Sequence, residues 1–204
     1  PTIMASIQGR NVAGEGVTIG SLNAKVEGDA HSKGAIDTKI LLVGVEYKEN
    51  QIDKAVLQIS GGLGNHQIKL HLQQKEKELS LDLHGKVADQ SWTGEVEDLF
   101  ISSVDDTIRL EKPALLEVSS KKAVLGDLCL LHEGGKACLV GQWLEGKWQA
   151  RAELLGFDPG YFSKDWPGTI NGKLVGQGDL SLNGGTHHVE LQSLSGNLKG
   201  KSLS

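Results

Sequence analysis

Two cysteines are the residues whose spacing most directly predicts a chemical feature. Cys129 and Cys138 are nine positions apart and enclose the segment LLHEGGKA. If they pair directly across a β-hairpin, Glu133-Gly134 remains as a two-residue turn. The pairs between the cysteines and the turn are then Leu130–Ala137, Leu131–Lys136 and His132–Gly135. Such a pair can hold its Cα atoms about 4.5 Å apart, which permits a disulfide and would imply an oxidising compartment. Two small buried thiols are the alternative interpretation.

The histidines do not show a metal-binding pattern. The seven are His31, His66, His71, His84, His132, His187 and His188. None is spaced to share a metal with a cysteine or with another histidine on the same strand face, and neighbours such as His187-His188 point to opposite faces of a strand. We therefore expect solvent-facing histidines, no metal site and no cofactor.

Other motifs that could support catalysis are incomplete. The segment Gly61–Gly64 is glycine-rich, as phosphate loops are, but no Lys-Ser/Thr follows it and no helix begins there. Asp105-Asp106 and the pair Glu95 and Glu97 are neighbouring carboxylates without a nucleophile or an aromatic cleft. Turn and surface roles account for them, so we expect that the protein is not an enzyme.

The composition favours a sheet that is apolar on one face. Aromatic residues are 4% and hydrophobic residues 38% of the 204, which is little for a thick two-sided core. The net charge of −5 argues against nucleic acid as a partner. There is no apolar run of 18 residues that could span a bilayer. Because the pattern is interrupted at both ends, we expect an internal fragment of a longer protein.

Period-two alternation predicts an antiparallel meander. In QIKLHLQ (67–73) and LSLDLHG (79–85), apolar residues alternate with polar ones, which puts them on one strand face. The strand-like stretches are 13–30, 36–47, 55–60, 67–73, 79–85, 92–103, 107–110 and 115–119, separated by glycine-rich or charged turns.

The apolar residues of these strands and of two later ones form a candidate hydrophobic groove. Its members are Leu57, Ile59, Ile68, Leu70, Leu72, Leu79, Leu81, Leu83, Trp148, Leu154, Leu180 and Leu182. An exposed apolar surface of this extent is a liability unless it is functional. A self-filled β-sandwich core is the alternative.

One short helix is predicted between strands. Asp158 is a suitable N-cap, Pro159 suits the first helical position, and Phe157 and Phe162 can form a hydrophobic staple. Trp166-Pro167-Gly168 would end this linker helix. The predicted organisation is a β segment at 1–155 with the cysteine hairpin, a linker at 156–168, and the start of a further β segment at 169–204.

The sequence resembles the TamB family, AsmA-like proteins of the Gram-negative envelope. The resemblance rests on LCLL…ACLVGQW, the following W-x-A-x-A-x-L strand, and FDPGYF…WPG. Trp92-Thr93-Gly94 and IRLEKPALLEVS (108–119) are also similar to that family's text. The resemblance covers roughly residues 50–204, and residues 1–49 match least.

The resemblance implies a fold, a location and partners. The fold would be a β-taco, an elongated amphipathic antiparallel sheet curled into a U with a hydrophobic inner groove. A helix outside this fragment would anchor the protein in the inner membrane. The chain would then cross the periplasm toward a BamA-like outer-membrane protein of the TamA type, which another part of the full protein would contact. Family roles are phospholipid movement between the membranes and assembly of outer-membrane proteins.

Three functions follow as hypotheses. The first is a conduit segment for phospholipid acyl chains. The second is a chaperone-like module that adds nascent outer-membrane or autotransporter strands to a sheet edge. The third is a structural extracellular β-repeat without cargo. Open sheet edges also predict edge-to-edge pairing of the fragment.

Overall fold

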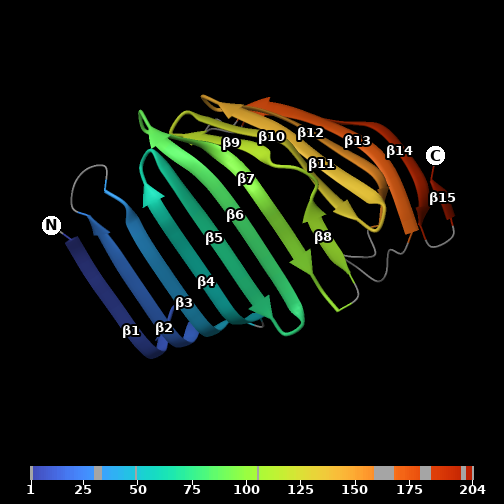
Figure 1. Cartoon of the computed structure of the whole chain (residues 1–204). Helices are drawn as coiled ribbons and strands as arrows, with labels where there is room; N and C mark the ends of the chain where they lie inside the picture. The colour runs from blue at the N-terminus through green and yellow to red at the C-terminus, as the bar shows by residue number, and fades with distance from the viewer. Residues whose placement is uncertain are drawn as a thin grey trace. The chain divides into compact units, whose positions relative to one another are not determined.

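The protein consists of β-strands throughout the part of the chain that the structure describes. The computed structural model describes residues 2–29, 34–48, 50–104, 106–158, 168–179, 185–198 and 201–203. Over these ranges there are fifteen strands in chain order and no helix (Figure 1). Accordingly, none of these residues belongs to a helix long and apolar enough to cross a bilayer. The prediction of an all-β antiparallel meander is confirmed.

The chain divides into two compact units. Unit one comprises Pro1–Asp89 and Gly94–Asp105, and unit two comprises Gln90–Thr93 and Asp106–Ser204. The predicted organisation into 1–155, 156–168 and 169–204 stays a prediction. Strand β13, which follows the expected linker, pairs directly with β12 within unit two.

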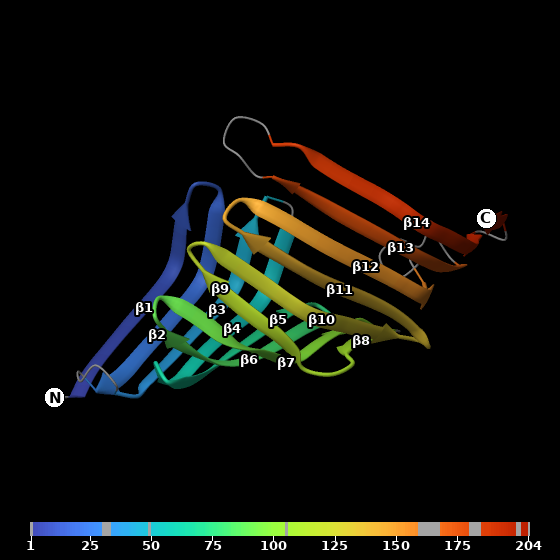
Figure 2. The same cartoon turned by 90° about the horizontal axis from the view of Figure 1, so that it is seen from above.

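Unit one is a series of long hairpins. Its strands are β1 (Thr2–Gly14), β2 (Val17–Asp29), β3 (Ile36–Tyr47), β4 (Asn50–Gly62), β5 (Asn65–Gln74), β6 (Lys77–Ala88) and most of β7 (Ser91–Ser102). From β1 to β6 each strand pairs antiparallel with the next one in sequence (Figure 2). Two-residue turns join β1 to β2 and β5 to β6, and Glu15, Gly16 and Lys75 take positive φ angles there.

Unit two is also built of antiparallel strands, but one of them, β10, pairs with three others. Its strands are β8 (Thr107–Leu110), β9 (Ala114–Ser119), β10 (Lys122–His132), β11 (Gly135–Leu144), β12 (Lys147–Phe157), β13 (Gly168–Asp179), β14 (His187–Leu198) and β15 (Lys201–Leu203). Both β8 and β9 pair with β10. The β10–β11 register is irregular between Leu125 and Leu128, and there Gly126 lets β9 approach closely. A Cβ on Gly126 would lie 3.1 Å from the Cβ of Leu115.

Few side chains are buried. Among the described residues the buried apolar side chains are Val96, Ile108, Ala114, Cys129 and Phe157. Only Val96 belongs to unit one, although that unit contains six long strands with apolar alternation. A self-filled sandwich would bury the inward residue of nearly every strand pair. Unit one therefore has an apolar face that its own strands leave uncovered.

Candidate functional site

The strand register of unit one arranges its apolar residues in rows that cross the strands. Residues directly opposite each other in an antiparallel pair share a face, so the pairs can be followed from strand to strand. The three rows are Ile7–Ala24–Ile40–Leu57–Leu70–Leu81, then Gly9–Leu22–Leu42–Ala55–Leu72–Leu79, then Ala5–Val26–Thr38–Ile59–Ile68–Leu83. We call these rows the unit-one apolar face. It contains every groove residue predicted between Leu57 and Leu83.

This face is partly open to solvent. The predicted groove residues from Leu57 to Leu83 are all of intermediate exposure, and none is buried. Toward the β1 edge the side chains become more exposed, and Ile7 reaches 63%. Such half-buried aliphatic side chains retain contact area that a hydrophobic ligand could cover.

The opposite face of unit one is polar and ion-paired. One row of cross-strand partners on this face is Ser6–Lys25–Lys39–Gln58–Lys69–Asp82. Lys69 Nζ lies 3.0 Å from Asp82 Oδ2, and Gln67 Nε2 donates to the same oxygen at 3.1 Å. The Lys25 ammonium donates a hydrogen bond to the Glu27 carboxylate, and this bond together with the negative charge of Glu27 raises the pKa of Lys25. The strands β1–β6 are thus amphipathic, as period-two alternation predicts, except where Leu41 pairs with Val56 on the polar face.

One residue extends the apolar face beyond what alternation alone would give. Asn11, within β1, has a φ of 50°, a left-handed conformation that asparagine tolerates better than most residues. A Cβ built on Gly9 would lie 3.0 Å from Val12 Cγ2 and 3.8 Å from Leu22 Cβ. Val12 therefore shares the face of Gly9 and Leu22, although it stands three positions after Gly9. Its cross-strand partners continue a fourth row: Val12–Ile19–Val45–Ile52.

Unit two has an apolar face of its own. Its rows are Leu128–Leu139–Ala152–Leu174–Leu191, then Leu130–Ala137–Leu154–Gly172–Leu194, then Leu125–Gly141–Ala150–Gly176–Val189, then Ala123–Trp143–Trp148–Gly178–His187. Trp148 and Leu154, two of the predicted groove residues, lie on it. Leu180 and Leu182 lie outside the described residues. Val189 and Leu191 are more than half exposed, at 58% and 56%.

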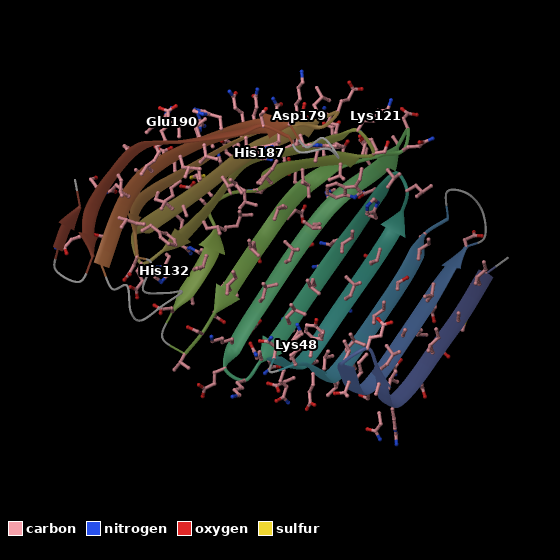
Figure 3. The ribbon with its side chains drawn as sticks, turned by 180° about the vertical axis from the view of Figure 1, so that it is seen from behind. Lys48, Lys121, His132, Asp179, His187 and Glu190 are labelled. Atoms are coloured by element: carbon pink, nitrogen blue, oxygen red, sulfur yellow. A yellow bond between two sulfur atoms is a disulfide. The ribbon has the colours of Figure 1, made fainter. Side chains whose placement is uncertain are left out.

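Trp148 covers a glycine-lined part of that face. Cβ atoms on Gly176 and Gly178 would lie 2.8 Å and 2.6 Å from atoms of the Trp148 ring, so glycine makes room for the indole to cross β13. Trp148 Nε1 donates to His187 Nδ1 at 3.2 Å. Since indole only donates, His187 Nδ1 is the acceptor of this hydrogen bond. Asp179, the last residue of β13, and His187, the first residue of β14, lie near each other in Figure 3.

Replacing Gly178 with alanine should destabilise unit two by about 1–3 kcal/mol through overpacking. The new Cβ would meet His187 Nδ1, Trp148 Nε1 and the backbone oxygen of Thr186, all within 2.7 Å. Gly172→Ala is the matched control, because its Cβ would have no neighbour closer than 3.4 Å. Urea unfolding followed by tryptophan fluorescence compares the two. Equal stability of both variants would show that the Trp148 indole can pack without a glycine at position 178.

The cysteine hairpin is formed as predicted. Cys129 and Cys138 are directly paired and joined by a disulfide, with Cα atoms 4.1 Å apart. The intervening pairs are Leu130–Ala137, Leu131–Lys136 and His132–Gly135. Glu133 and Gly134 form the turn with φ angles of 41° and 82°. The alternative of two buried thiols does not apply to this structure.

The predicted linker helix falls largely outside the described residues. Asp158 directly follows β12 and has no helical conformation. Pro159, Phe162 and Trp166 lie outside the part of the chain that the structure describes. Phe157 ends β12 and is buried, with its ring centroid 6.4 Å from that of His132.

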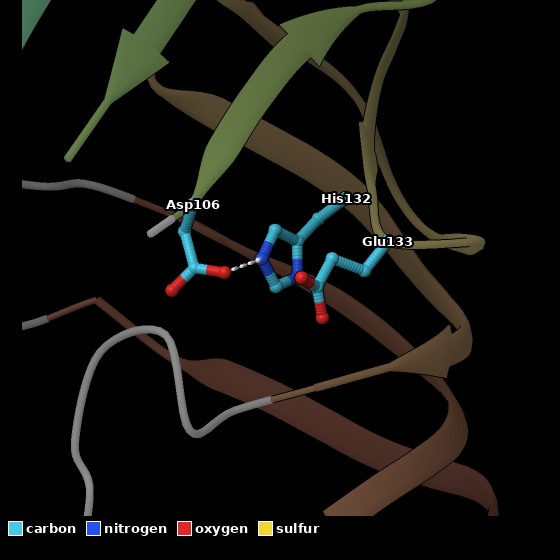
Figure 4. A group of neighbouring side chains, drawn as sticks. All are labelled: Asp106, His132 and Glu133. Atoms are coloured by element: carbon cyan, nitrogen blue, oxygen red, sulfur yellow. Dashed lines mark hydrogen bonds and ion pairs between the residues drawn. The ribbon is translucent and has the colours of Figure 1, made fainter. Parts of the chain in front are cut away.

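The prediction of solvent-facing histidines is wrong for His132, which is only 3% exposed. It ends β10, where Phe157 and Asp106 lie against its ring. Asp106 Oδ1 is 3.4 Å from His132 Nε2, and Glu133 lies beside the ring (Figure 4). Sequence spacing could not reveal this cluster, since 26 positions separate Asp106 from His132.

Together these features define a class: amphipathic antiparallel β-sheet proteins that present an open apolar face and a polar back. The model of the TamB N-terminal domain matches residues 1–146. The chain belongs to the TamB family. No curated protein and no solved structure matches it.

The family match corrects the extent of the resemblance seen in the sequence. Residues 1–49, which were expected to match least, lie within the matched part. In the structure, β1–β3 continue the same cross-strand rows as β4–β6. The segment FDPGYF…WPG, which contributed to the resemblance, lies beyond residue 146.

Proposed function

We propose that this chain is a segment of a hydrophobic conduit that carries phospholipid between the inner and outer membranes and supports outer-membrane protein assembly. The observation that supports it is the set of predominantly apolar rows that cross β1–β6, with a mainly polar face behind them. In the U-shaped β-taco implied by family resemblance, such faces would line a continuous groove. The proposed role is not enzymatic.

The energetics favour this use of the face. A phospholipid carries on the order of 30 methylenes, each worth about 0.8 kcal/mol to keep from water, so crossing an aqueous space unshielded costs roughly 25 kcal/mol. Aliphatic side chains that cover the acyl chains remove most of that cost, while the headgroup stays in solvent. Such shielding needs no catalytic group.

The setting of the proposed conduit follows from the TamB family. We place the full protein in the periplasm, anchored in the inner membrane. Its proposed partner is an outer-membrane protein of the TamA type, bound by a part of the protein outside residues 1–204. The disulfide Cys129–Cys138 supports an oxidising compartment.

Site-specific photo-crosslinking in cells tests the conduit. A photoreactive residue at Leu79, Leu81 or Leu83 should capture phospholipid, whereas one at Ser80 or Asp82 should not. The first three residues lie on the unit-one apolar face, and the other two lie on the polar face next to them. Mass spectrometry of the adducts is the measurement.

Each other outcome points elsewhere. Equal lipid capture by photoreactive residues on the two faces of β6 would contradict a one-sided groove. Polypeptide adducts in place of lipid would favour the chaperone-like β-augmentation module. Absence of any hydrophobic adduct would favour a structural β-repeat.

A further inference from the structure

Three potential ligands converge at the turn of the cysteine hairpin. Asp106 precedes β8 by one residue, His132 is the last residue of β10, and Glu133 is the first residue of the β10–β11 turn. One donor atom from each lies within 4.8 Å of the other two. In Figure 4 the imidazole stands between the two carboxylates.

Burial of the histidine distinguishes this cluster from other histidine–carboxylate pairs, whereas Asp106 is 30% exposed and Glu133 is exposed. His71–Glu78 and His84–Glu97 approach to 3.3 and 3.5 Å, but each has one carboxylate and side chains at least 38% exposed. His132 is 3% exposed, and Phe157 packs near its ring. An imidazole held in this way loses little side-chain entropy when it binds a ligand.

The separation of the donor atoms suits a shared metal ion. His132 Nε2 and Asp106 Oδ1 are 3.4 Å apart. A charge-assisted hydrogen bond between nitrogen and a carboxylate is usually about 2.7–2.9 Å long. Two ligands at about 2.0–2.1 Å from a tetrahedral zinc ion are separated by roughly 3.3 Å. The observed distance is that of a long hydrogen bond and is also close to the separation of two zinc ligands.

We propose that Asp106, His132 and Glu133 bind a divalent transition-metal ion of the zinc class. Imidazole nitrogen and carboxylate oxygens are an accepted donor set for zinc, and water would complete the coordination. Glu133 lies on a turn, so rotation of its side chain can close the third bond. The metal would tie the β10–β11 turn to the beginning of β8, a second link beside the disulfide in the same hairpin.

Calorimetric titration of the untagged 204-residue chain with zinc chloride tests the site. We expect saturable 1:1 binding to the wild type, and affinity at least tenfold lower for Asp106→Asn and for Glu133→Gln. Glu145→Gln is the matched control. Glu145 also begins a Glu-Gly turn with positive φ, at 47°, and should leave the affinity unchanged.

Amide hydrogen exchange supplies a second readout that does not depend on the variants. Zinc should slow exchange in residues 106–110 and 130–135 of the wild type and leave β4 and β5 unchanged. Absence of saturable binding to the wild type would overturn the proposal. So would zinc affinity that is equal in all variants, or protection confined to other histidines.

Discussion

Leu81→Arg should abolish phospholipid capture by the unit-one apolar face while leaving the protein folded. Leu81 lies in the row with Ile40, Leu57 and Leu70, so an arginine there would place a charge among side chains proposed to cover acyl chains. We expect at least a tenfold loss of co-purified phospholipid, measured by mass spectrometry of organic extracts. The free energy of unfolding should fall by only about 1 kcal/mol, because Leu81 is not fully buried.

Ser80→Arg is the control for added charge. Ser80 is the preceding residue of the same strand and pairs with His71 on the polar face, so this variant should retain lipid. Loss of lipid in both variants would show that the effect does not depend on which strand face carries the added charge. A loss of several kcal/mol of stability in Leu81→Arg would instead indicate a packed core and favour the filled sandwich.

Reduction of Cys129–Cys138 should lower the free energy of unfolding of unit two by about 2.6 kcal/mol, roughly an 80-fold change in its unfolding equilibrium. The estimate comes from the loop entropy released in the unfolded chain when a link across a sequence separation of 9 is broken. Urea unfolding with and without reductant measures it. Amide exchange should rise in β10 and β11 and stay unchanged in β4 and β5.

The double variant Cys129→Ala/Cys138→Ala separates the disulfide from other effects of the reductant. It should be less stable than the oxidised wild type and insensitive to added reductant. If the wild type had the same free energy of unfolding with and without reductant, strand pairing alone would hold the hairpin closed.

Features governed by neighbouring residues were predictable from the sequence. The register of the cysteine hairpin follows from the spacing of Cys129 and Cys138 and from the glycine in its turn, and every predicted pair is present. β8 (Thr107–Leu110) has the predicted limits, and β9 (Ala114–Ser119) begins one residue earlier than predicted. Alternation also assigned the groove residues from Leu57 to Leu83 to one face, because a period of two leaves no other arrangement.

Features that depend on distant residues or unusual backbone were missed. His132 was expected in solvent because nothing in its own strand shows that Phe157 and Asp106 cover it. The row containing Val12 was missed because it requires Asn11 to adopt a left-handed conformation, which alternation does not anticipate. The strand-like stretch expected at residues 13–30 proved to comprise the end of β1 and the whole of β2.

The exclusive pairing of sequence neighbours in β1–β6 has a consequence for how such a chain can change in length. No strand there needs a partner from far along the sequence, so a whole hairpin could be gained or lost without disturbing the others. Each hairpin adds about 10 Å across the sheet, at about 4.8 Å per strand. Insertion of a single residue within a strand would instead turn the following apolar side chains to the polar face. The width of such a sheet can therefore change in steps of two strands, with its surface chemistry preserved.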